Sequence, residues 1–154
     1  MVIIPAEKRH IPAMLRLLGQ VGALHGQGRP ELFRSDALKY DAAQLEALLQ
    51  DPGCPIFIAE EGEVLGYCFC QKQVVEGNAC VCGRKELYID DLCVDEAARG
   101  RGIGRALYEF VRSWAKGEGY DHITLHVWNF PGSAVEFYRS LGMGERYYCM
   151  EEKL

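Results

Sequence analysis

Long apolar runs are missing from this sequence, and so are low-complexity tracts and internal repeats. No stretch approaches the ~20 apolar residues that a membrane-spanning helix needs, and the N-terminus lacks the pattern of a signal peptide. An excess of positive charge is also missing, because 17 Lys and Arg oppose 22 Asp and Glu for a net charge of −5. These absences predict a soluble, cytoplasmic protein that has neither a membrane nor a nucleic acid as its general partner.

The cysteines lack the features of a disulfide framework. Their number, seven, is odd, which favours reduced thiols over a set of paired bridges. One alternative stays open, because Cys68 with Cys70 and Cys80 with Cys82 flank a predicted turn and four thiols could bind zinc or pair as disulfides. The usual Cys-x-x-Cys spacing is absent, and the four histidines show no i, i+4 spacing. No metal is therefore expected.

The first half of the chain shows alternating strand and helix signals. A strand is predicted at residues 2–4, followed by a helix whose apolar face carries Ile11, Met14, Leu15 and Leu18. A long polar loop leads to a second helix, which Asp41 and Gln44 cap and which stops near residues 51–53. Strands at 55–60 and 64–73 flank the hairpin signal at residues 61–63.

The second half continues this alternation. A turn near residues 76–78 leads to a strand, a glycine-rich loop and a helix with apolar residues at Ile103, Ala106, Leu107, Phe110, Val111 and Trp114. A strand is expected at 123–128, and the Ser133-x-x-Glu136 pattern predicts a capped helix from Ser133 to Gly142. With 49% hydrophobic residues in 154, the chain suits one α/β (α+β) domain, 1–154, around one mixed sheet.

The most informative segment is residues 87–108, LYIDDLCVDEAARGRGIGRALY. Gly100, Gly102 and Gly104 allow backbone N–H groups to approach an anion closely, and the following helix directs its positive dipole end at the same place. A nucleotide-hydrolysing loop would need Gly-Lys-Ser/Thr there, and a dinucleotide fingerprint would need glycine where Arg105 stands. Both of those ligand classes are disfavoured.

Arg99-Gly100-Arg101-Gly102-Ile103-Gly104 resembles the Arg/Gln-x-x-Gly-x-Gly/Ala pyrophosphate loop of the GNAT family of N-acetyltransferases. The resemblance extends to the later strand, to the Phe-Tyr pair in residues 134–142, to the N-terminal segment and to a closing strand at 145–154. It implies a mostly antiparallel central sheet flanked by about four helices. It also implies acetyl-CoA (coenzyme A) as the cofactor, a homodimer in many relatives, and an amine acceptor.

The resemblance further implies which residues hold coenzyme A. Backbone groups of Leu92, Cys93 and Val94 would pair with the pantetheine arm. Residues Arg99, Gly100, Arg101, Gly102, Ile103 and Gly104 would hold the pyrophosphate, with Arg105 nearby; a solvated turn is the alternative. Family members often carry an asparagine where this chain has Pro131. Asn129 either replaces that contact or only shapes the turn, and Ser133 at the predicted helix start completes the expected contacts.

Tyr138 resembles by position the family tyrosine that protonates the leaving thiolate, although it also fits the apolar stripe of its helix as an ordinary core residue. Asp90 and Asp91 are candidate bases, because two adjacent carboxylates are unusual in a strand. Related polyamine-type enzymes carry a glutamate at the position of Asp90. Alternatively, both aspartates only solvate a sheet edge or bind backbone groups.

Strand alternation places Leu87, Ile89, Asp91 and Cys93 on one face and Tyr88, Asp90, Leu92 and Val94 on the other. Only one of the two carboxylates would then face the acceptor. A β-bulge, which the family carries in this strand, would reverse the assignment.

The loop from His25 to Phe33 resembles the segment that borders the acceptor site in the family. His25, Glu31 and Phe33 are the candidate acceptor-binding residues, and an ordinary surface loop anchored by Leu32 and Phe33 is the alternative. The acidic balance favours a cationic acceptor, on a small molecule or a peptide. Two functions follow from the sequence: an N-acetyltransferase that uses Tyr138 as general acid, and a non-catalytic domain that binds or senses acyl-CoA.

Overall fold

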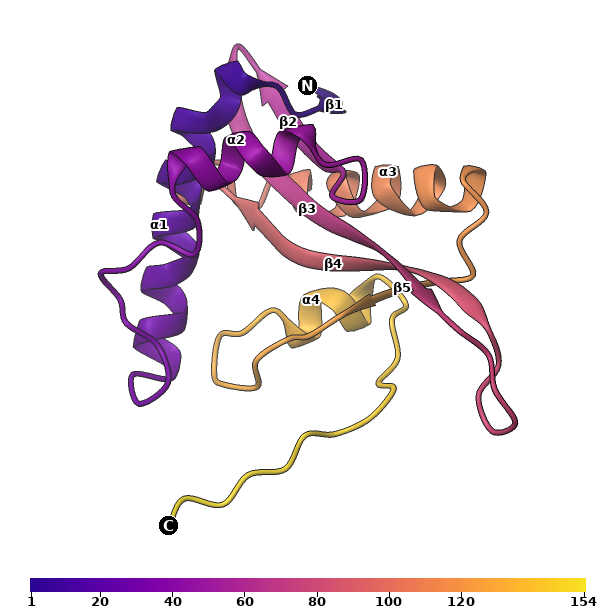
Figure 1. Ribbon diagram of the computed structural model, residues 1–154. Coiled ribbons are helices and arrows are strands. Elements are labelled where there is room, and N and C mark those ends of the chain that lie inside the picture. The colour runs from indigo at the N-terminus through magenta and orange to yellow at the C-terminus, as the bar shows by residue number, and fades with distance from the viewer.

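The computed structural model describes residues 1–154 and is built around a mixed five-stranded sheet in the order β1-β2-β3-β4-β5 (Figure 1). The strands are β1 (Val2–Pro5), β2 (Ile56–Glu61), β3 (Glu63–Val75), β4 (Arg84–Val94) and β5 (His122–Leu125). The first four strands pair antiparallel, and β5 pairs parallel to β4. This order confirms the expected mixed, mostly antiparallel sheet.

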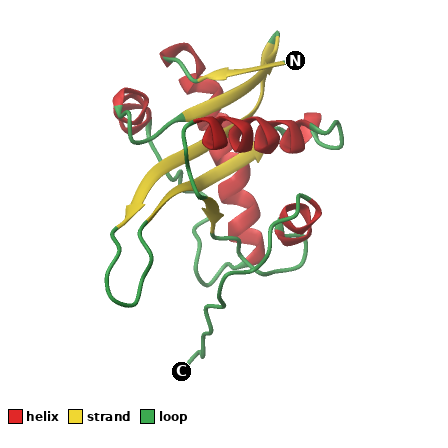
Figure 2. Ribbon diagram, turned by 90° about the vertical axis from the view of Figure 1, so that its right-hand side faces the viewer, coloured by secondary structure: helices red, strands yellow, loops and turns green.

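Helices cover both faces of the sheet (Figure 2). They are α1 (Ile11–Gly28), α2 (Ala42–Gln50), α3 (Ile103–Gly117) and α4 (Val135–Ser140), with short 3₁₀ turns at Lys8–His10 and Glu96–Ala98. α1 and α2 pack with Tyr67 and Phe69 of β3 on one face, while α3 packs with Cys68 and Cys70 on the other. The apolar face predicted for α3 is confirmed, and its Leu107 and Val111 are completely buried.

Helix capping was predicted correctly in one place and wrongly in another. At α2, the Gln44 N–H donates to Asp41 Oδ1 over 2.8 Å and the Asp41 N–H donates to Gln44 Oε1 over 2.9 Å, so the capping box is confirmed. The Ser133–Glu136 box is wrong, because α4 begins at Val135 after Ala134 without a side-chain cap. The predicted end is confirmed: Gly142 has φ +88° and its N–H donates to the Arg139 carbonyl.

A β-bulge in β4 reverses the predicted faces of this strand. Phe69 pairs with Asp91 and Cys70 pairs with Ile89, which leaves Asp90 as the extra residue. Ile89 therefore packs on the α3 side, while Cys93 packs on the α1 side, although plain alternation puts both on one face. The assignment without a bulge is thus wrong beyond Ile89, and the reversal foreseen from the family resemblance is confirmed.

Three boundaries differ from expectation. α1 continues to Gly28, so His25 belongs to the last helical turn and not to a loop. β5 ends at Leu125, short of the expected 128, and residues 145–154 form no strand. With only four residues, β5 offers a short edge for pairing with another strand. The tail 144–154 makes no backbone hydrogen bonds. Side chains hold the tail instead, through the ion pair of Arg146 with the buried Glu86.

All seven cysteines are free thiols. Cys68 and Cys70 are buried in the α3-side core, whereas Cys80 and Cys82 are exposed in the turn between β3 and β4. These four thiols are therefore not gathered, and no three His, Cys, Asp or Glu side chains are grouped to bind a metal. No helix has both the length and the apolar character that crossing a membrane requires.

Candidate active site

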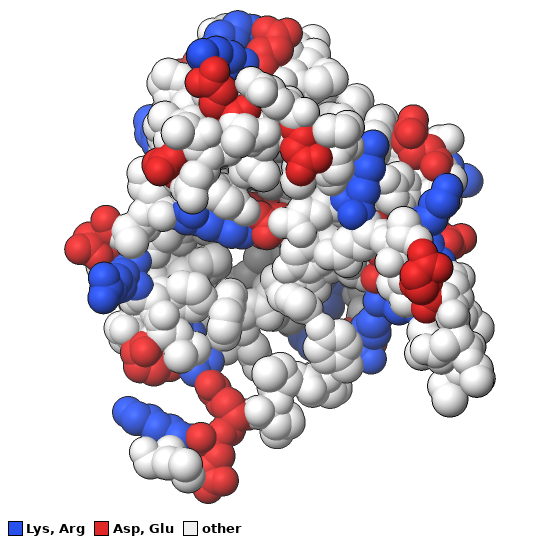
Figure 3. Space-filling model, in the orientation of Figure 1, with Lys and Arg blue, Asp and Glu red and all other residues white.

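The sheet opens between β4 and β5. β5 pairs only with residues 86–89 of β4, so the edge of residues 90–94 that would face it has no neighbouring strand. The opening begins at the bulged Asp90, because the bulge bends the strand there. The face that includes this region is hollowed near its middle (Figure 3). Among the predicted contacts in this stretch, Leu92 and Val94 pack toward α3, and Cys93 is buried against α1.

The glycine-rich loop lies at the start of α3, beyond the end of β4. Gly100 and Gly102 both have φ +78°, a left-handed conformation that side chains rarely adopt, and Gly102 is the N-cap of α3. The backbone N–H groups of residues 100–105 donate no hydrogen bond within the protein. Unpaired N–H groups at a helix N-terminus, supported by the helix dipole, form an anion-binding site. The loop therefore fits a pyrophosphate.

The arginines of this loop lie on the surface. Arg101 donates to Glu61 over 2.7 Å, Arg105 lies 3.7 Å from Glu109, and Arg99 lies 3.8 Å from Glu96. Exposed pairs of this kind contribute only about 0–1 kcal/mol each, so a phosphate can replace these carboxylates at little cost. Ile103, in contrast, is buried and anchors the first turn of α3 in the core.

Tyr138 lies in α4, which packs against the beginning of α3. A Cβ added at Gly104 would come within 3.2 Å of the Phe137 ring, so α3 and α4 pack closely at this point. The Tyr138 hydroxyl makes no hydrogen bond within the protein. Burial, followed by the nearby Cys68 and Asp91, raises the pKa of Tyr138 well above its usual value. The phenol therefore keeps its proton at neutral pH.

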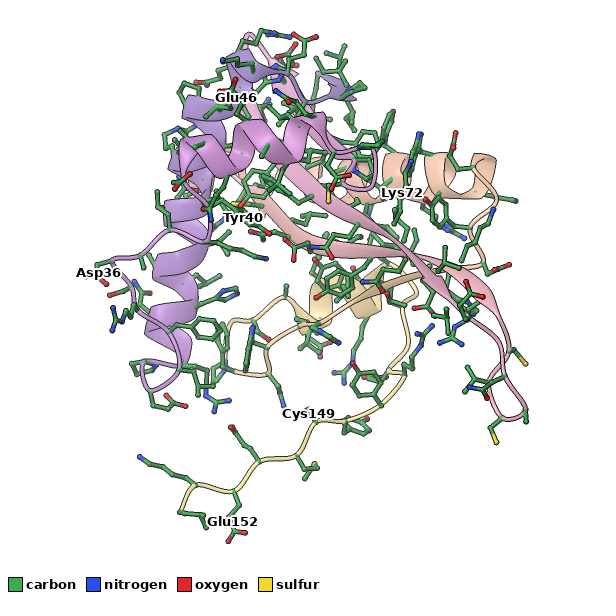
Figure 4. The ribbon with its side chains drawn as sticks, viewed as in Figure 1. Asp36, Tyr40, Glu46, Lys72, Cys149 and Glu152 are labelled. Carbon is green, nitrogen blue, oxygen red and sulfur yellow. The ribbon has the colours of Figure 1, made fainter.

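Asp90 is bound by two side chains from the segment before α2. Its Oδ2 accepts hydrogen bonds from Tyr40 Oη and from Lys39 Nζ, each over 2.8 Å. The Lys39 ammonium also donates to the Asp90 carbonyl over 3.2 Å. Tyr40 lies on the segment that leads into α2 (Figure 4). Its ring stacks on Phe69 with centroids 5.9 Å apart, which fixes the hydroxyl beside the carboxylate.

Asp91 is the next residue of β4 and contacts Tyr67 of β3. The Tyr67 hydroxyl donates to its Oδ2 over 3.0 Å. Burial raises the pKa of Asp91 to about 6, and the charge of Asp90 contributes to this rise against the opposing effects of Lys39 and Tyr67. A carboxyl with a pKa near neutrality is suited to accept a proton during turnover. The bulge thus brings both aspartates to the side of α1 and α2, where alternation alone would have separated them.

Two of the three predicted acceptor residues lie together. His25 packs against Phe33 with ring centroids 5.0 Å apart, and Phe33 meets the edge of Trp128 at 4.9 Å. Phe130 completes this aromatic group at 6.3 Å from His25. Burial, followed by the charge of Lys39, lowers the pKa of His25, so the ring is mainly neutral at pH 7. Glu31 is paired with Arg29 and takes no part in the group.

The remaining predicted contacts lie in the connection from β5 to α4. Asn129 is exposed and makes no side-chain hydrogen bond, while the Ser133 N–H donates to the Phe130 carbonyl over 3.0 Å. Both residues therefore keep a free side chain on this connection.

Sequence reasoning missed five residues of the site: Lys39, Tyr40, Tyr67, Trp128 and Phe130. Lys39 and Tyr40 are about fifty positions away from Asp90 along the chain, so no spacing pattern connects them. Tyr67 reaches Asp91 only because their two strands pair in this register. The polar Lys39-Tyr40-Asp41 run before a helix cap was the only available signal, and it is a weak one.

A sequence model of the acetyltransferase (GNAT) family matches residues 23–143. The match covers most of the chain and includes the glycine-rich loop at residues 99–105, both aspartates and Tyr138. The chain therefore belongs to this family of acyltransferases. Among solved structures, a tetramutant of the BH1408 protein from Bacillus halodurans is similar with a TM-score of 0.94 and 31% identity, covering 100% of each chain. An aminoglycoside acetyltransferase from a soil metagenome, solved with sisomicin, shares the fold (TM-score 0.72, 20% identity, 99% of this chain and 95% of that one).

Curated relatives are similar over shorter segments. N-acetyltransferase 8B of Rattus norvegicus is 33% identical over 111 residues, which are 71% of this chain and 48% of that relative. Streptothricin acetyltransferase of Streptomyces lavendulae is 36% identical over 58 residues, 38% of this chain and 31% of that protein. The chain thus spans about half or less of the length of these relatives.

Proposed function

We propose that this protein transfers an acetyl group from acetyl-CoA to a primary amine of a small molecule or peptide, by direct attack of the amine. The carrying observation is the run of unpaired N–H groups at residues 100–105, at the N-terminus of α3. Such donors suit the pyrophosphate of coenzyme A. The acetyl thioester supplies the group to be transferred, and the chain's own residues position and protonate the reactants.

The unpaired edge of β4 supports the placement of the cofactor arm. Residues 92–94 lack a neighbouring strand on the side of β5, so their backbone groups can pair with an extended amide-containing chain as another strand would. The cradle at 99–105 lies directly beyond this edge along the chain. One continuous track therefore leads from the pyrophosphate site to Asp90, where β4 and β5 separate.

Proton transfer is assigned to groups on opposite sides of this opening. An amine with a pKa of about 10.4 arrives protonated and must lose a proton before attack. Asp91, with its pKa of about 6, accepts that proton directly or through water, and Asp90 helps to hold the cation. As the C–N bond forms and the C–S bond breaks, Tyr138 gives its proton to the leaving thiolate.

The surroundings of the two aspartates support a cationic acceptor. Two carboxylates within one opening attract an ammonium group, and the aromatic group of His25, Phe33, Trp128 and Phe130 offers apolar surface beside them. The proposed acceptor therefore has a primary amine and an adjacent apolar or extended part. Glu31, paired with Arg29, is left with at most an outer role.

Calorimetric titration with acetyl-CoA, followed by thiol release across a panel of amines, tests this proposal. We expect binding together with amine-dependent release of free thiol. Binding without release from any amine would favour a domain that senses acyl-CoA. Absence of binding would contradict the role assigned to residues 99–105.

A cytoplasmic location and a homodimer belong to the same proposal. Free thiols on the surface, at Cys80 and Cys149, fit a reducing compartment. Tyr148 and Met150 in the C-terminal tail are 77% and 87% exposed, and a second copy of the chain could cover them. Light scattering of purified protein, with and without the tail from residue 144, tests the dimer.

A further inference from the structure

The candidate active site already contains a primary amine of the protein itself. Lys39 Nζ lies 2.8 Å from Asp90 Oδ2 and 3.2 Å from the Asp90 carbonyl oxygen, at the bulge where β4 and β5 separate. We propose that Lys39 is an acetylation site of this protein, modified within its own molecule by acetyl-CoA bound in the opening. The inference rests on the proposed function, because it uses the same cofactor track and the same acid.

The position of Lys39 supports a role as an acceptor. Its ammonium contacts the carboxylate and carbonyl of the residue at which the free edge of β4 begins. Its side chain is 43% exposed, so it is not buried in a fixed structural ion pair, whereas the Asp90 side chain is only 13% exposed. Lys39 also lies in the connection between α1 and α2, outside regular structure, which allows the short movement that attack needs.

Charge effects on neighbouring groups agree with this position. Burial is the main cause of the lowered pKa of His25, and the positive charge of Lys39 is the second cause. The same charge opposes the rise in the pKa of Asp91. Lys39 is thus electrostatically close to both the aromatic group and Asp91. An external amine that entered the opening would have to approach the same groups.

The chemical step balances without any additional reactant. The Lys39 ammonium loses one proton to the Asp90 carboxylate, which passes it to water. The neutral amine attacks the thioester carbonyl, so that a C–N bond forms, the C–S bond breaks, and the nitrogen releases its second proton to water. Tyr138 protonates the leaving thiolate and recovers a proton from solvent. The products are acetyl-lysine, free coenzyme A and one proton.

Lys8 provides a matched comparison within the chain. Its Nζ also forms an ion pair with a carboxylate, Glu46 Oε1 at 2.6 Å, but this pair is exposed and joins the N-terminal segment to α2. The rate of non-enzymatic acetylation by free acetyl-CoA follows the accessibility of each lysine. The Lys8 side chain is 74% exposed and the Lys39 side chain is 43% exposed. Non-enzymatic modification therefore predicts faster reaction at Lys8, and the proposal predicts the opposite.

The experiment incubates the protein with acetyl-CoA without an added amine and follows acetyl occupancy of each lysine by peptide mass spectrometry. We expect Lys39 to react at least about tenfold faster than Lys8, because a positioned amine has a high effective concentration. The first-order rate should not change with protein concentration. Lys39→Arg should abolish the fast modification and Lys8→Arg should leave it intact. Thiol release by the Lys39→Arg variant with added amines is measured in parallel.

The two measurements separate the two proposals. Transfer to added amines together with slow or absent Lys39 modification would overturn this inference and leave the acetyltransferase standing. Modification that rises in proportion to protein concentration would overturn it as well, since transfer would then occur between molecules. Failure of both reactions in protein that binds acetyl-CoA would overturn the proposed function itself.

Discussion

The two sides of the candidate active site differ in composition: one consists of backbone groups and the other of side chains. The cofactor side consists of backbone groups from one short segment, residues 99–105, whose N–H groups are left free by the start of α3. The acceptor side consists of side chains from four separate parts of the chain, namely His25, Lys39, Asp90 and Trp128. A backbone cradle survives most substitutions, whereas a side-chain cluster changes with each one. Under the proposed function, substitutions could therefore change the acceptor while the cofactor site is kept.

Tyr138 lies between the two sides and should show the largest effect. Tyr138→Phe removes the only proton that the phenol can donate, so we expect kcat of thiol release to fall about 100-fold. Acetyl-CoA affinity should change little, because the cradle lies elsewhere. Tyr108→Phe is the matched control, since burial also raises the pKa of Tyr108 and its hydroxyl also makes no hydrogen bond within the protein. Equal kcat values for the two variants would remove Tyr138 from the mechanism.

The cradle itself can be broken through its backbone. Gly102→Val places a β-branched residue at φ +78°, which costs about 1–3 kcal/mol unless the peptide rotates. Rotation would turn N–H groups away from the anion site, so we expect at least about tenfold weaker acetyl-CoA binding by calorimetry.

Gly119→Val is the control for this change. Gly119 follows the other end of α3, has φ +75°, and likewise has no atom within 4 Å of an added Cβ. Both variants should lose similar stability in urea unfolding, and only Gly102→Val should lose affinity. Equal affinities would show that the conformation of Gly102 does not matter for binding.

The ionisation of Asp91 should make the stability of the protein depend on pH. Its folded-state pKa of about 6 lies above the usual unfolded value of about 3.9. The folded protein therefore binds this proton more tightly, and the stability from Asp91 is present below pH 4 and lost as pH rises through about 6. At about 1.4 kcal/mol per pKa unit, the loss is at most roughly 3 kcal/mol.

Asp91→Asn should cancel that loss, because the amide oxygen can still accept the hydrogen bond from Tyr67. We expect the variant to gain stability relative to wild type at pH 7.5 but not at pH 4.5, as measured by urea unfolding. Asp36→Asn, at an exposed carboxyl without a hydrogen bond, should show no such difference. In wild type, kcat/KM should fall as pH drops below about 6. A gain that is independent of pH would contradict the assigned ionisation.

Much of the fold could be predicted from the sequence because its signals are local. The amphipathic stripe of α3, the Asp41–Gln44 cap and the hairpin at Gly62 all depend on residues a few positions apart. The glycine loop was predictable for the same reason. The Ser133–Glu136 box failed because a competing local turn takes its place: the Ser133 N–H donates to the Phe130 carbonyl, and α4 starts two residues later.

The acceptor side could be predicted only in part, because packing brings it together. His25 and Phe33 were identified, but their partner Trp128 is almost a hundred positions away. Lys39 and Tyr40 reach Asp90 across the sheet, and the bulge that lets both aspartates face them follows from no residue pattern in β4. The extension of α1 to Gly28 also depends on packing, since a Cβ at Gly26 would collide with Ser35.

The smallest expected effect concerns the aromatic group, and it sharpens the comparison most. Phe33→Ala removes the ring that meets both His25 and Trp128, whereas Leu32→Ala changes a neighbouring side chain that is 49% exposed. We expect Phe33→Ala to raise KM for the amine by about three- to tenfold, the loss of one apolar contact surface, with acetyl-CoA affinity unchanged. Leu32→Ala should leave both values close to wild type. If Phe33→Ala weakened acetyl-CoA binding as well, the two sides would be energetically coupled. The acceptor side could then not change independently of the cofactor side.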